Sequence, residues 1–530
     1  PDRVVDIGIN SFYGCSSLTS VKLGKSVKYI VYKSFGGCGN LNNIEVDANN
    51  VNFSSIDGDL YTKDADKLVA YARGKTNTEF VVPSSVTSIR NMAFSGCKNL
   101  KSVSLSRVNA IYGCTFENCI ALTSVTIPDS VDSIAYDAFR GCDNLKYNEY
   151  GNGRYLGNAK EPYYALIDAS DVGVTAVDIK EGTRIIADKA FYNCTDLTRV
   201  TFSNKVAKIG ESAFEGCENL TNIDIPDSMR IINDRAFSGC GSLTSVIIPD
   251  GVTSIGANAF SDCVKLASVA IGKGVKTIEE STFGGCSSLT SVNMNAVTKI
   301  SSYAFKDCIG LENVNIPNTV TSIIGTAFEG CVSLSNIVVD EGNVIFNSID
   351  GNLYQQVEYV GMTLVQYAIG KADTQFTIPD GVVSIWQYAF DGSENLTSIT
   401  ISSSVTRVSG IKGCYNLSNI LVEGDGAAYK SVDGVLYSKS GTTLVQYPMG
   451  KKDTQFTVSD DVTYIGAAAF NDCKNLTSIT IGKTVNDIGS GAFSGCANLQ
   501  NFKVADNNGY YTSIDGNLYT KSWGRYKLVQ

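Results

Sequence analysis

Residues 252–275 read VTSIGANAFSDCVKLASVAIGKGV, and the chain repeats this stretch along its length. Residues 206–229 (VAKIGESAFEGCENLTNIDIPDSM) and 462–485 (VTYIGAAAFNDCKNLTSITIGKTV) follow the same pattern, V-x-x-I-G-x-x-A-F-x-x-C-x-x-L-x-x-V-x-I-P. The cysteines give its period, because Cys217 follows Cys194 by 23 residues (217 − 194 = 23) and Cys240, Cys263 and Cys286 continue the series. A fixed period of this length indicates a solenoid of stacked repeats.

Each repeat has the features of one leucine-rich-repeat coil. Alternation in residues 125–127 points alternate side chains inward, as a strand requires, and Pro128 ends the strand because proline cannot donate to a ladder. A second short strand follows, and then one helical turn is expected, since Phe260, Cys263 and Leu266 lie three residues apart and share a face. The prediction is an α/β repeat solenoid, a leucine-rich-repeat horseshoe or rod with a parallel β-sheet on one face and short strands and single helical turns on the other.

We count sixteen coils of 22–23 residues in one solenoid over residues 1–530, which we expect to be truncated at both ends. Fifteen coils carry the repeat cysteine and one has Ser393 in its place. Inserts interrupt the stack at 47–79, 147–182, 340–375, 423–455 and 505–530. All except 147–182 contain S-[IV]-D-G-x-L-Y, and Asp-Gly between apolar runs predicts a β-hairpin on one side of a coil. The repeated tyrosines of these inserts, such as Tyr61 and Tyr71, are expected to brace the hairpins.

Composition excludes several classes of partner. The formal net charge is −10 and Lys and Arg form no cluster, so the chain lacks the basic stripe of a nucleic-acid-binding protein. No apolar run approaches the ~20 residues of a membrane helix, so we expect no direct membrane insertion of this segment. A leader or an anchor would lie outside it. A monomer is the expected state.

The residues that usually carry chemistry are sparse. The chain has no histidine, which removes Ser-His-Asp and Cys-His catalysis, and we expect no cofactor and no metal site. The regular cysteines predict a ladder of small buried thiols rather than disulfides or zinc ligands. Cys114 lies outside this ladder and is a candidate exposed, reactive thiol. Asp57 and Asp59 faintly resemble a calcium loop, but turn chemistry explains their Asp-Gly better.

The repeat resembles that of the BspA-type leucine-rich-repeat surface proteins. Ala213-Phe214-Glu215-Gly216-Cys217 and Leu122-Thr123-Ser124-Val125-Thr126-Ile127-Pro128 match its A-F-x-x-C and L-x-x-V-x-I-P segments, and the likeness covers essentially the whole chain. The resemblance implies an extracellular or cell-surface protein of a host-associated microbe, with a role in adhesion to host matrix proteins or to other cells.

The outward positions beside the inward Val of L-x-x-V-x-I are the candidate ligand-contact face. They are Ser102, Ser124, Thr126, Arg199, Thr201, Asn222, Asp224, Ser245, Ser268, Ser291, Asn293, Asn313 and Asn315. The same residues could merely solvate an open sheet, since this face has few Trp, Tyr or Arg anchors.

The main hypothesis is a non-enzymatic adhesion or recognition module that binds a host extracellular protein or glycan. A structural spacer rod is the alternative. A carbohydrate-active enzyme is a third reading, which would need two facing carboxylates in a cleft.

Overall fold

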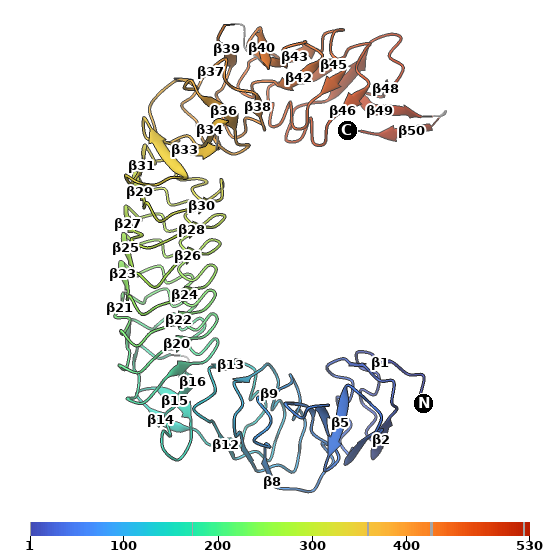
Figure 1. The fold of residues 1–530 in the computed structure, drawn as a ribbon, viewed down its shortest axis with the longest axis vertical. Helices are drawn as coiled ribbons and strands as arrows, with labels where there is room; N and C mark the ends of the chain where they lie inside the picture. Colours follow the sequence, from blue (N-terminus) through green and yellow to red (C-terminus); the bar gives the residue numbers. More distant parts are fainter. Residues whose placement is uncertain (1, 172, 358–359, 425–427, 523–524, 530) are drawn as a thin grey trace. The chain divides into compact units, whose positions relative to one another are not determined.

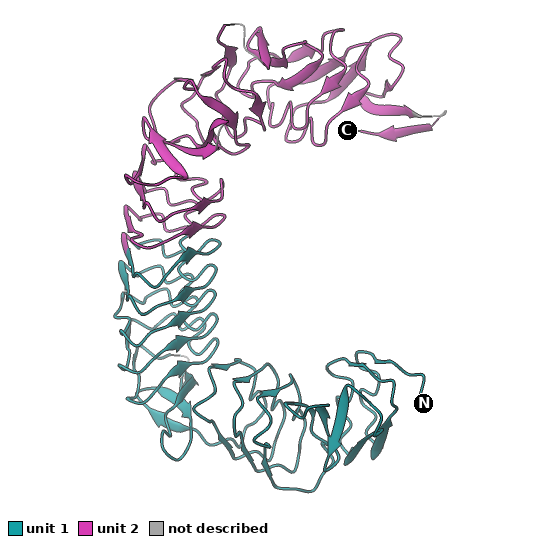
Figure 2. Cartoon of the chain, viewed as in Figure 1, with its two compact units in different colours: residues 1–266, 270–283 teal, residues 267–269, 284–530 magenta. Residues whose placement is uncertain are grey.

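The computed structural model describes residues 2–171, 173–357, 360–424, 428–522 and 525–529. Within this part of the chain, every regular element is a β-strand. The chain divides into two compact units, residues 1–266 with 270–283 and residues 267–269 with 284–530 (Figure 2). Because the two units are described separately, the single solenoid expected over residues 1–530 stays a prediction.

The strand of the L-x-x-V-x-I segment, here called the first strand of a coil, pairs in parallel with the first strands of neighbouring coils. In unit 1 these are β2 (Ser20–Leu23), β4 (Asn43–Val46), β8 (Glu79–Val81), β10 (Ser102–Ser104), β12 (Ser124–Thr126), β17 (Ala176–Asp178), β19 (Arg199–Thr201), β21 (Asn222–Ile223) and β23 (Ser245–Ile248). In unit 2 they are β27 (Ser291–Asn293), β29 (Asn313–Ile316), β31 (Asn336–Val339), β35 (Gln375–Thr377), β37 (Ser398–Ile401), β39 (Asn419–Val422), β43 (Gln455–Thr457), β45 (Ser478–Ile481) and β47 (Asn501–Val504), while β25 (Ser268–Ile271) has residues in both units.

The V-x-x-I segment forms the second strand of a coil, which is usually two residues long. In unit 1 the second strands are β1 (Asp6–Ile7), β3 (Tyr29–Ile30), β9 (Ser88–Ile89), β11 (Ala110–Ile111), β13 (Ser133–Ile134), β18 (Ile185–Ile186), β20 (Lys208–Ile209), β22 (Ile231–Ile232), β24 (Ser254–Ile255) and β26 (Thr277–Ile278). In unit 2 they are β28 (Lys299–Ile300), β30 (Ser322–Ile323), β36 (Val382–Ile385), β38 (Arg407–Val408), β44 (Tyr464–Ile465) and β46 (Asp487–Ile488). In Figure 1, β20, β22 and β24 lie one above another and β21 and β23 form the facing column.

The predicted helical turns are not confirmed, because the described residues contain no helix, so the α/β description is replaced by an all-β solenoid. In the turn segment A-F-x-x-C, Ser212 and Gly216 have φ of 55° and 75°, and left-handed residues this close together interrupt a helix. The Phe214 N–H therefore donates to Ala236 O of the next coil at 2.8 Å instead of to its own coil. The predicted shared face does exist, since Phe260, Cys263 and Leu266 are all fully buried.

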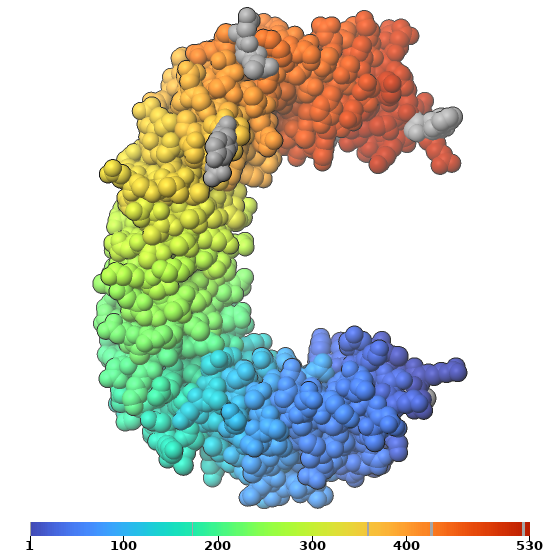
Figure 3. Space-filling model, in the orientation of Figure 1, coloured from blue at the N-terminus to red at the C-terminus, as the bar shows by residue number. Residues whose placement is uncertain are grey.

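Two ladders run through the core of each stack. Neighbouring phenylalanines stack nearly parallel, with ring centroids 5.2 Å apart for Phe214–Phe237 and 5.3 Å for Phe237–Phe260. The Cys240 thiol donates to Phe214 O at 3.2 Å, and burial raises its pKa to about 12. The predicted ladder of buried thiols is thus confirmed, with the exceptions of exposed Cys15 and half-buried Cys496. The closely packed surface of the coils around β20–β24 is visible in Figure 3.

Each insert forms a three-stranded antiparallel meander. The strands are β5 (Phe53–Ile56), β6 (Asp59–Thr62) and β7 (Lys67–Ala70); β14 (Asn148–Tyr150), β15 (Gly153–Leu156) and β16 (Ala165–Ala169); β32 (Phe346–Ile349), β33 (Asn352–Val357) and β34 (Gly361–Gln366); β40 (Tyr429–Val432), β41 (Val435–Ser438) and β42 (Thr443–Gln446); and β48 (Tyr511–Ile514), β49 (Asn517–Ser522) and β50 (Arg525–Leu528). In four inserts the last strand pairs in parallel with the next second strand, as β7 does with β9. The inserts therefore contribute rungs to the solenoid.

The Asp-Gly turn of the hairpin docks against a first strand. Gly58 O accepts the Ile44 N–H at 2.8 Å, and the Ser55 hydroxyl donates to Ile44 O. Gly58 has φ of 80°, and a Cβ there would lie 2.7 Å from Asn43 Oδ1. The turn thus occupies the edge of β4, so the β2–β4 sheet ends at this strand.

The second tyrosine of the insert joins the aromatic ladder. The Tyr71 N–H donates to Ala93 O at 2.9 Å, and its ring centroid lies 5.4 Å from that of Phe94. Tyr71 is 2% exposed and Tyr61 1%, so both rings belong to the core. This placement gives the tyrosines a packing role.

Candidate binding surface

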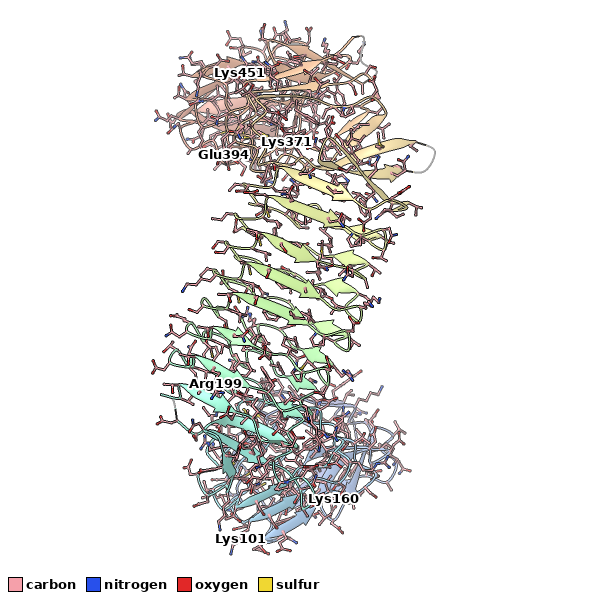
Figure 4. All side chains as sticks on the ribbon, turned by 90° about the vertical axis from the view of Figure 1, so that its left-hand side faces the viewer. Lys101, Lys160, Arg199, Lys371, Glu394 and Lys451 are labelled. Carbon is pink, nitrogen blue, oxygen red and sulfur yellow. The ribbon has the colours of Figure 1, made fainter. Side chains whose placement is uncertain are left out.

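The predicted contact face is polar and exposed along the first strands of unit 1. Ser124, Thr126, Arg199, Thr201, Asn222, Asp224 and Ser245 are exposed and Ser102 is half-buried. The residues between them, such as Val125 and Val200, are 5% and 4% exposed, because alternate side chains of a strand point to opposite faces. Figure 4 looks onto the first strands and labels Arg199 among them.

In unit 2 the predicted contact residues have the same polar character. Ser268, Ser291, Asn293, Asn313 and Asn315 are all exposed, and the Asn315 side-chain amide donates to Asp340 Oδ1 at 2.9 Å. The partners of Asn313 and Asn315 on β31 are Asn336 and Val338.

Arg199 is the one basic residue among the predicted contacts. Its Nη1 donates to Asp178 Oδ1 at 3.1 Å and to Thr201 Oγ1 at 2.9 Å, and both charged side chains are more than half exposed. An exposed ion pair of this kind contributes only about 0–1 kcal/mol, so a ligand carboxylate could replace Asp178 at little cost.

The predicted residues of unit 1 do not form one continuous sheet. The structure brings Arg199, Thr201 and Asn222 together on β17–β19–β21, with Arg199 directly opposite Asn222. Ser102, Ser124 and Thr126 lie on the separate sheet β8–β10–β12. The insert 147–182 lies between the two sheets in the sequence.

Sequence reasoning missed a second set of candidates beside the turn segments. Exposed tyrosines occur there in both units: Tyr13, Tyr32, Tyr112, Tyr136 and Tyr192 in unit 1, and Tyr388 and Tyr415 in unit 2. The Lys189 ammonium lies 4.4 Å from the Tyr136 ring centroid and 5.1 Å from that of Tyr192. Tyrosine is a common hot-spot residue, and its occurrence at variable positions next to the buried Phe was the available signal.

Tyr136 also borders a cavity of about 770 Å³ between its coil and the insert 147–182. Inside it, Arg154 forms a two-pronged ion pair with Asp168, with Nε–Oδ1 and Nη2–Oδ2 distances of 2.6 Å each. The guanidinium also lies 5.0 Å from the Tyr147 ring centroid. Burial raises the pKa of Asp168, and Arg154 opposes this rise. The ion pair with Arg154 stabilises the charged form of Asp168, so this carboxyl is a poor candidate for a catalytic acid.

Cys114 does not match the predicted reactive thiol. It is half-buried, and its S–H donates to Asp137 Oδ2 at 3.1 Å. Burial and the Asp137 carboxylate raise its pKa to about 11. Since the thiolate is the nucleophile, this environment lowers reactivity at neutral pH.

The other candidate sites of the sequence have structural partners. Asp59 is buried, accepts the Ala72 N–H at 2.8 Å and pairs with Lys75 at 2.7 Å. Among the described residues, no group of three or more His, Cys, Asp or Glu side chains could hold a metal ion. No helix in that part of the chain has the length and apolarity to cross a membrane.

A sequence model of the BspA type leucine rich repeat region matches residues 1–63, 69–158, 170–290, 276–359, 370–429 and 449–523. A comparison with curated proteins gives no match. Among solved structures, a leucine rich cell surface protein from Faecalibacterium prausnitzii is similar, with 23% identity, 86% of this chain and 94% of that chain covered, and a TM-score of 0.38. Leucine-rich repeat proteins from Bacteroides ovatus (20%, 86% and 93%, 0.32) and Eubacterium ventriosum (20%, 64% and 94%, 0.40) are also similar.

Proposed function

The chain belongs to the BspA-type leucine-rich-repeat family, and from this premise we propose that it is a non-enzymatic recognition and adhesion module displayed at a cell surface. Its partner is a host extracellular protein or glycan, which it binds through the extended repeat surface. A solenoid presents the same surface chemistry many times, so weak contacts add up when the partner is also repetitive.

One observation carries this proposal: the exposed polar residues stand on a backbone that the core holds rigid. Arg199, Thr201 and Asn222 project from strands whose inward residues Val200 and Ile223 are 4% exposed each. Side chains on such a scaffold lose little backbone entropy on binding, which favours affinity from small polar contacts. A spacer rod needs no such patch, and binding therefore separates the two functions.

The test is solid-phase binding of the chain to a panel of host matrix proteins and host glycans at several salt concentrations. Arg199→Ala combined with Asn222→Ala should weaken saturable binding by roughly tenfold, because it removes the one cation and a facing amide of this patch. Stronger binding at low salt is expected if Arg199 meets an acidic group.

The matched control is Lys299→Ala combined with Ser322→Ala. These residues are also a cation and a small polar residue, exposed and directly opposite each other, but on the second strands β28 and β30. Loss of binding in both variants, or in neither, would contradict recognition on the first strands. A third variant, Tyr136→Ala with Tyr192→Ala, tests the turn segments, and absence of binding to every panel member would favour the spacer.

A further inference from the structure

The second strands of unit 1 are interrupted where the first insert enters. Among the described strands, β3 pairs only with β1, whereas β9 belongs to the sheet β5–β6–β7–β9. A cavity of about 570 Å³ lies at this interruption, between β3 and the strands of the insert. We call it the Arg90 cavity; the residues that matter below are Lys28, Tyr29, Tyr32, Lys67 and Arg90, which all line it.

The charges of the Arg90 cavity have one sign. Lys28, Lys67 and Arg90 line it and no carboxylate does, although acidic residues outnumber basic ones by 53 to 43 in the chain. None of the three cations has an ion pair with any residue that the structure describes. Three unpaired cations around one cavity in an acidic protein favour an anionic occupant.

Arg90 is the deepest of the three. Its Nη1 donates to Ile30 O at 2.6 Å, which bridges the interruption, and its other N–H groups have no protein acceptor among the described residues. Burial lowers its pKa, with no neighbouring charge to offset the effect. A half-buried guanidinium with donors left over is the group that best binds a planar oxyanion.

The chain contains its own comparisons for this place. In unit 2, the insert strand β34 pairs with β36 as β7 does with β9, which aligns Thr363 and Trp386 with Lys67 and Arg90. Thr321, before β30, corresponds to Lys28, before β3. All three positions are neutral there, and the indole of Trp386 lies against Gly325.

The third copy gives the same result. Thr406, Thr443 and Gly466 occupy the positions of Lys28, Lys67 and Arg90 beside β38, β42 and β44. The third copy does carry Arg407, at the position of Tyr29, but neither copy has a cation at the three positions themselves. Packing alone therefore does not require Lys28, Lys67 and Arg90.

We propose that the Arg90 cavity is a binding site for an acidic sugar, whose carboxylate or sulfate meets Arg90, Lys28 and Lys67 and whose ring lies against Tyr29 and Tyr32. These tyrosines are 65% and 52% exposed, and such rings offer apolar faces to the C–H surface of a sugar. Asn91 lines the same cavity and can bond to a ring hydroxyl, whereas the Thr62 hydroxyl already donates to Asp66 Oδ1 at 2.6 Å. The volume suits one or two sugar units.

The experiment is titration calorimetry of the whole chain with three probes: a hyaluronan tetrasaccharide (carboxylate), N-acetylglucosamine 6-sulfate (sulfate) and chitotetraose (neutral). At least one acidic probe should bind, more weakly at 300 mM than at 50 mM salt, and chitotetraose should not. Which acidic probe binds identifies the anionic group. Equal affinity for chitotetraose, or no binding of either acidic probe, would overturn the proposal.

Four variants locate the site. Lys28→Met and Lys67→Met should each raise Kd by roughly threefold to tenfold, and Arg90→Met by more than tenfold. Arg90→Gly installs the residue that the third copy has at this position, Gly466, so it should fold and should not bind. Lys101→Met, an exposed lysine outside the cavity that Figure 4 labels, is the matched control and should change Kd less than twofold.

Lys28→Met and Lys67→Met leave the Arg90–Ile30 hydrogen bond intact, so both variants should keep the cavity folded. If both retain the affinity of the wild type, the assignment of the sugar site to the Arg90 cavity is overturned. The proposal goes beyond the recognition surface on the first strands. Arg199→Ala with Asn222→Ala leaves this cavity untouched, so the failure of one proposal does not imply the failure of the other.

Discussion

Removing one ring from the aromatic ladder should open the solenoid locally. Phe237 is fully buried between Phe214 and Phe260, with interplanar angles of 2° and 10°. Phe→Ala in a core costs about 3–5 kcal/mol, which includes the transfer of the ring and the cavity it leaves. We therefore expect Phe237→Ala to destabilise its coil by about 4 kcal/mol, and Phe237→Leu by about 1–1.5 kcal/mol.

Hydrogen exchange measures this loss coil by coil. The Phe214 and Phe237 N–H groups donate to Ala236 O and Ala259 O at 2.8 Å each, so both should be protected in the wild type. A loss of about 4 kcal/mol should accelerate their exchange roughly a thousandfold. Each coil contacts only its neighbours, so amides near Phe328 in unit 2 should change little.

Tyr192→Ala is the control because its ring is 43% exposed beside the same ladder. It should cost at most about 1 kcal/mol, the contribution of an exposed cation–π contact. If the Phe214 and Phe237 amides exchange less than tenfold faster in Phe237→Ala, the rings are not the main source of local stability. An acceleration spread evenly over the chain would contradict the nearest-neighbour picture.

Three further outcomes can be checked by thermal or denaturant unfolding. The Tyr447 hydroxyl donates to Asp453 at 2.9 Å, whereas the buried Tyr71 hydroxyl has no partner among the described residues, so Tyr447→Phe should cost about 1 kcal/mol and Tyr71→Phe should be neutral or stabilising. Burial raises the pKa of Asp188 to about 6, so the contribution of the protonated carboxyl to stability is complete below pH 3.8 and is lost as the pH rises through 6. The free energy of unfolding of Asp188→Asn should equal that of the wild type near pH 4 and exceed it by about 2 kcal/mol at pH 7. Gly58→Ala should destabilise the first hairpin by about 2 kcal/mol, because φ is 80° and the new Cβ meets Asn43.

The sequence predicted the coil well because the buried residues recur with the 23-residue period. It did not separate a helical turn from linked β-turns, since Phe260, Cys263 and Leu266 share a face in both. The distinguishing signal is the residue before each cysteine, such as Asn118, Asn193 or Asp262, which has positive φ. Asn and Asp tolerate this conformation better than most residues, so a ladder of such residues favours turns over a helix.

The inserts lack the repeat cysteine, which is the clearest marker of the period in the sequence. Their tyrosines nevertheless keep the period: Tyr71 precedes Phe94 by 23 residues (94 − 71 = 23), and Tyr367 precedes Phe390 by 23 (390 − 367 = 23). The ring centroids of these pairs lie 5.4 Å and 5.7 Å apart, as expected of neighbouring rungs. The hydrophobic period of a solenoid therefore extends through an insert when a larger aromatic residue replaces the Phe.

The candidate sites follow a different rule from the ladders. Residues on a regular stretch of first strand are set by the repeat, and the sequence alone places them outward. The Arg90 cavity depends on residues 28, 67 and 90. Lys67 precedes Arg90 by one period (90 − 67 = 23), but Lys28 lies outside this spacing, and the docked hairpin brings the three residues together. An insert interrupts the ladder of second strands, so the residues beside these strands can vary without cost to the core. Trp386 and Gly466, which occupy the position of Arg90 in the other two copies, are examples. Interruptions of the repeat are therefore the places where a stack of nearly identical coils can acquire an individual binding site.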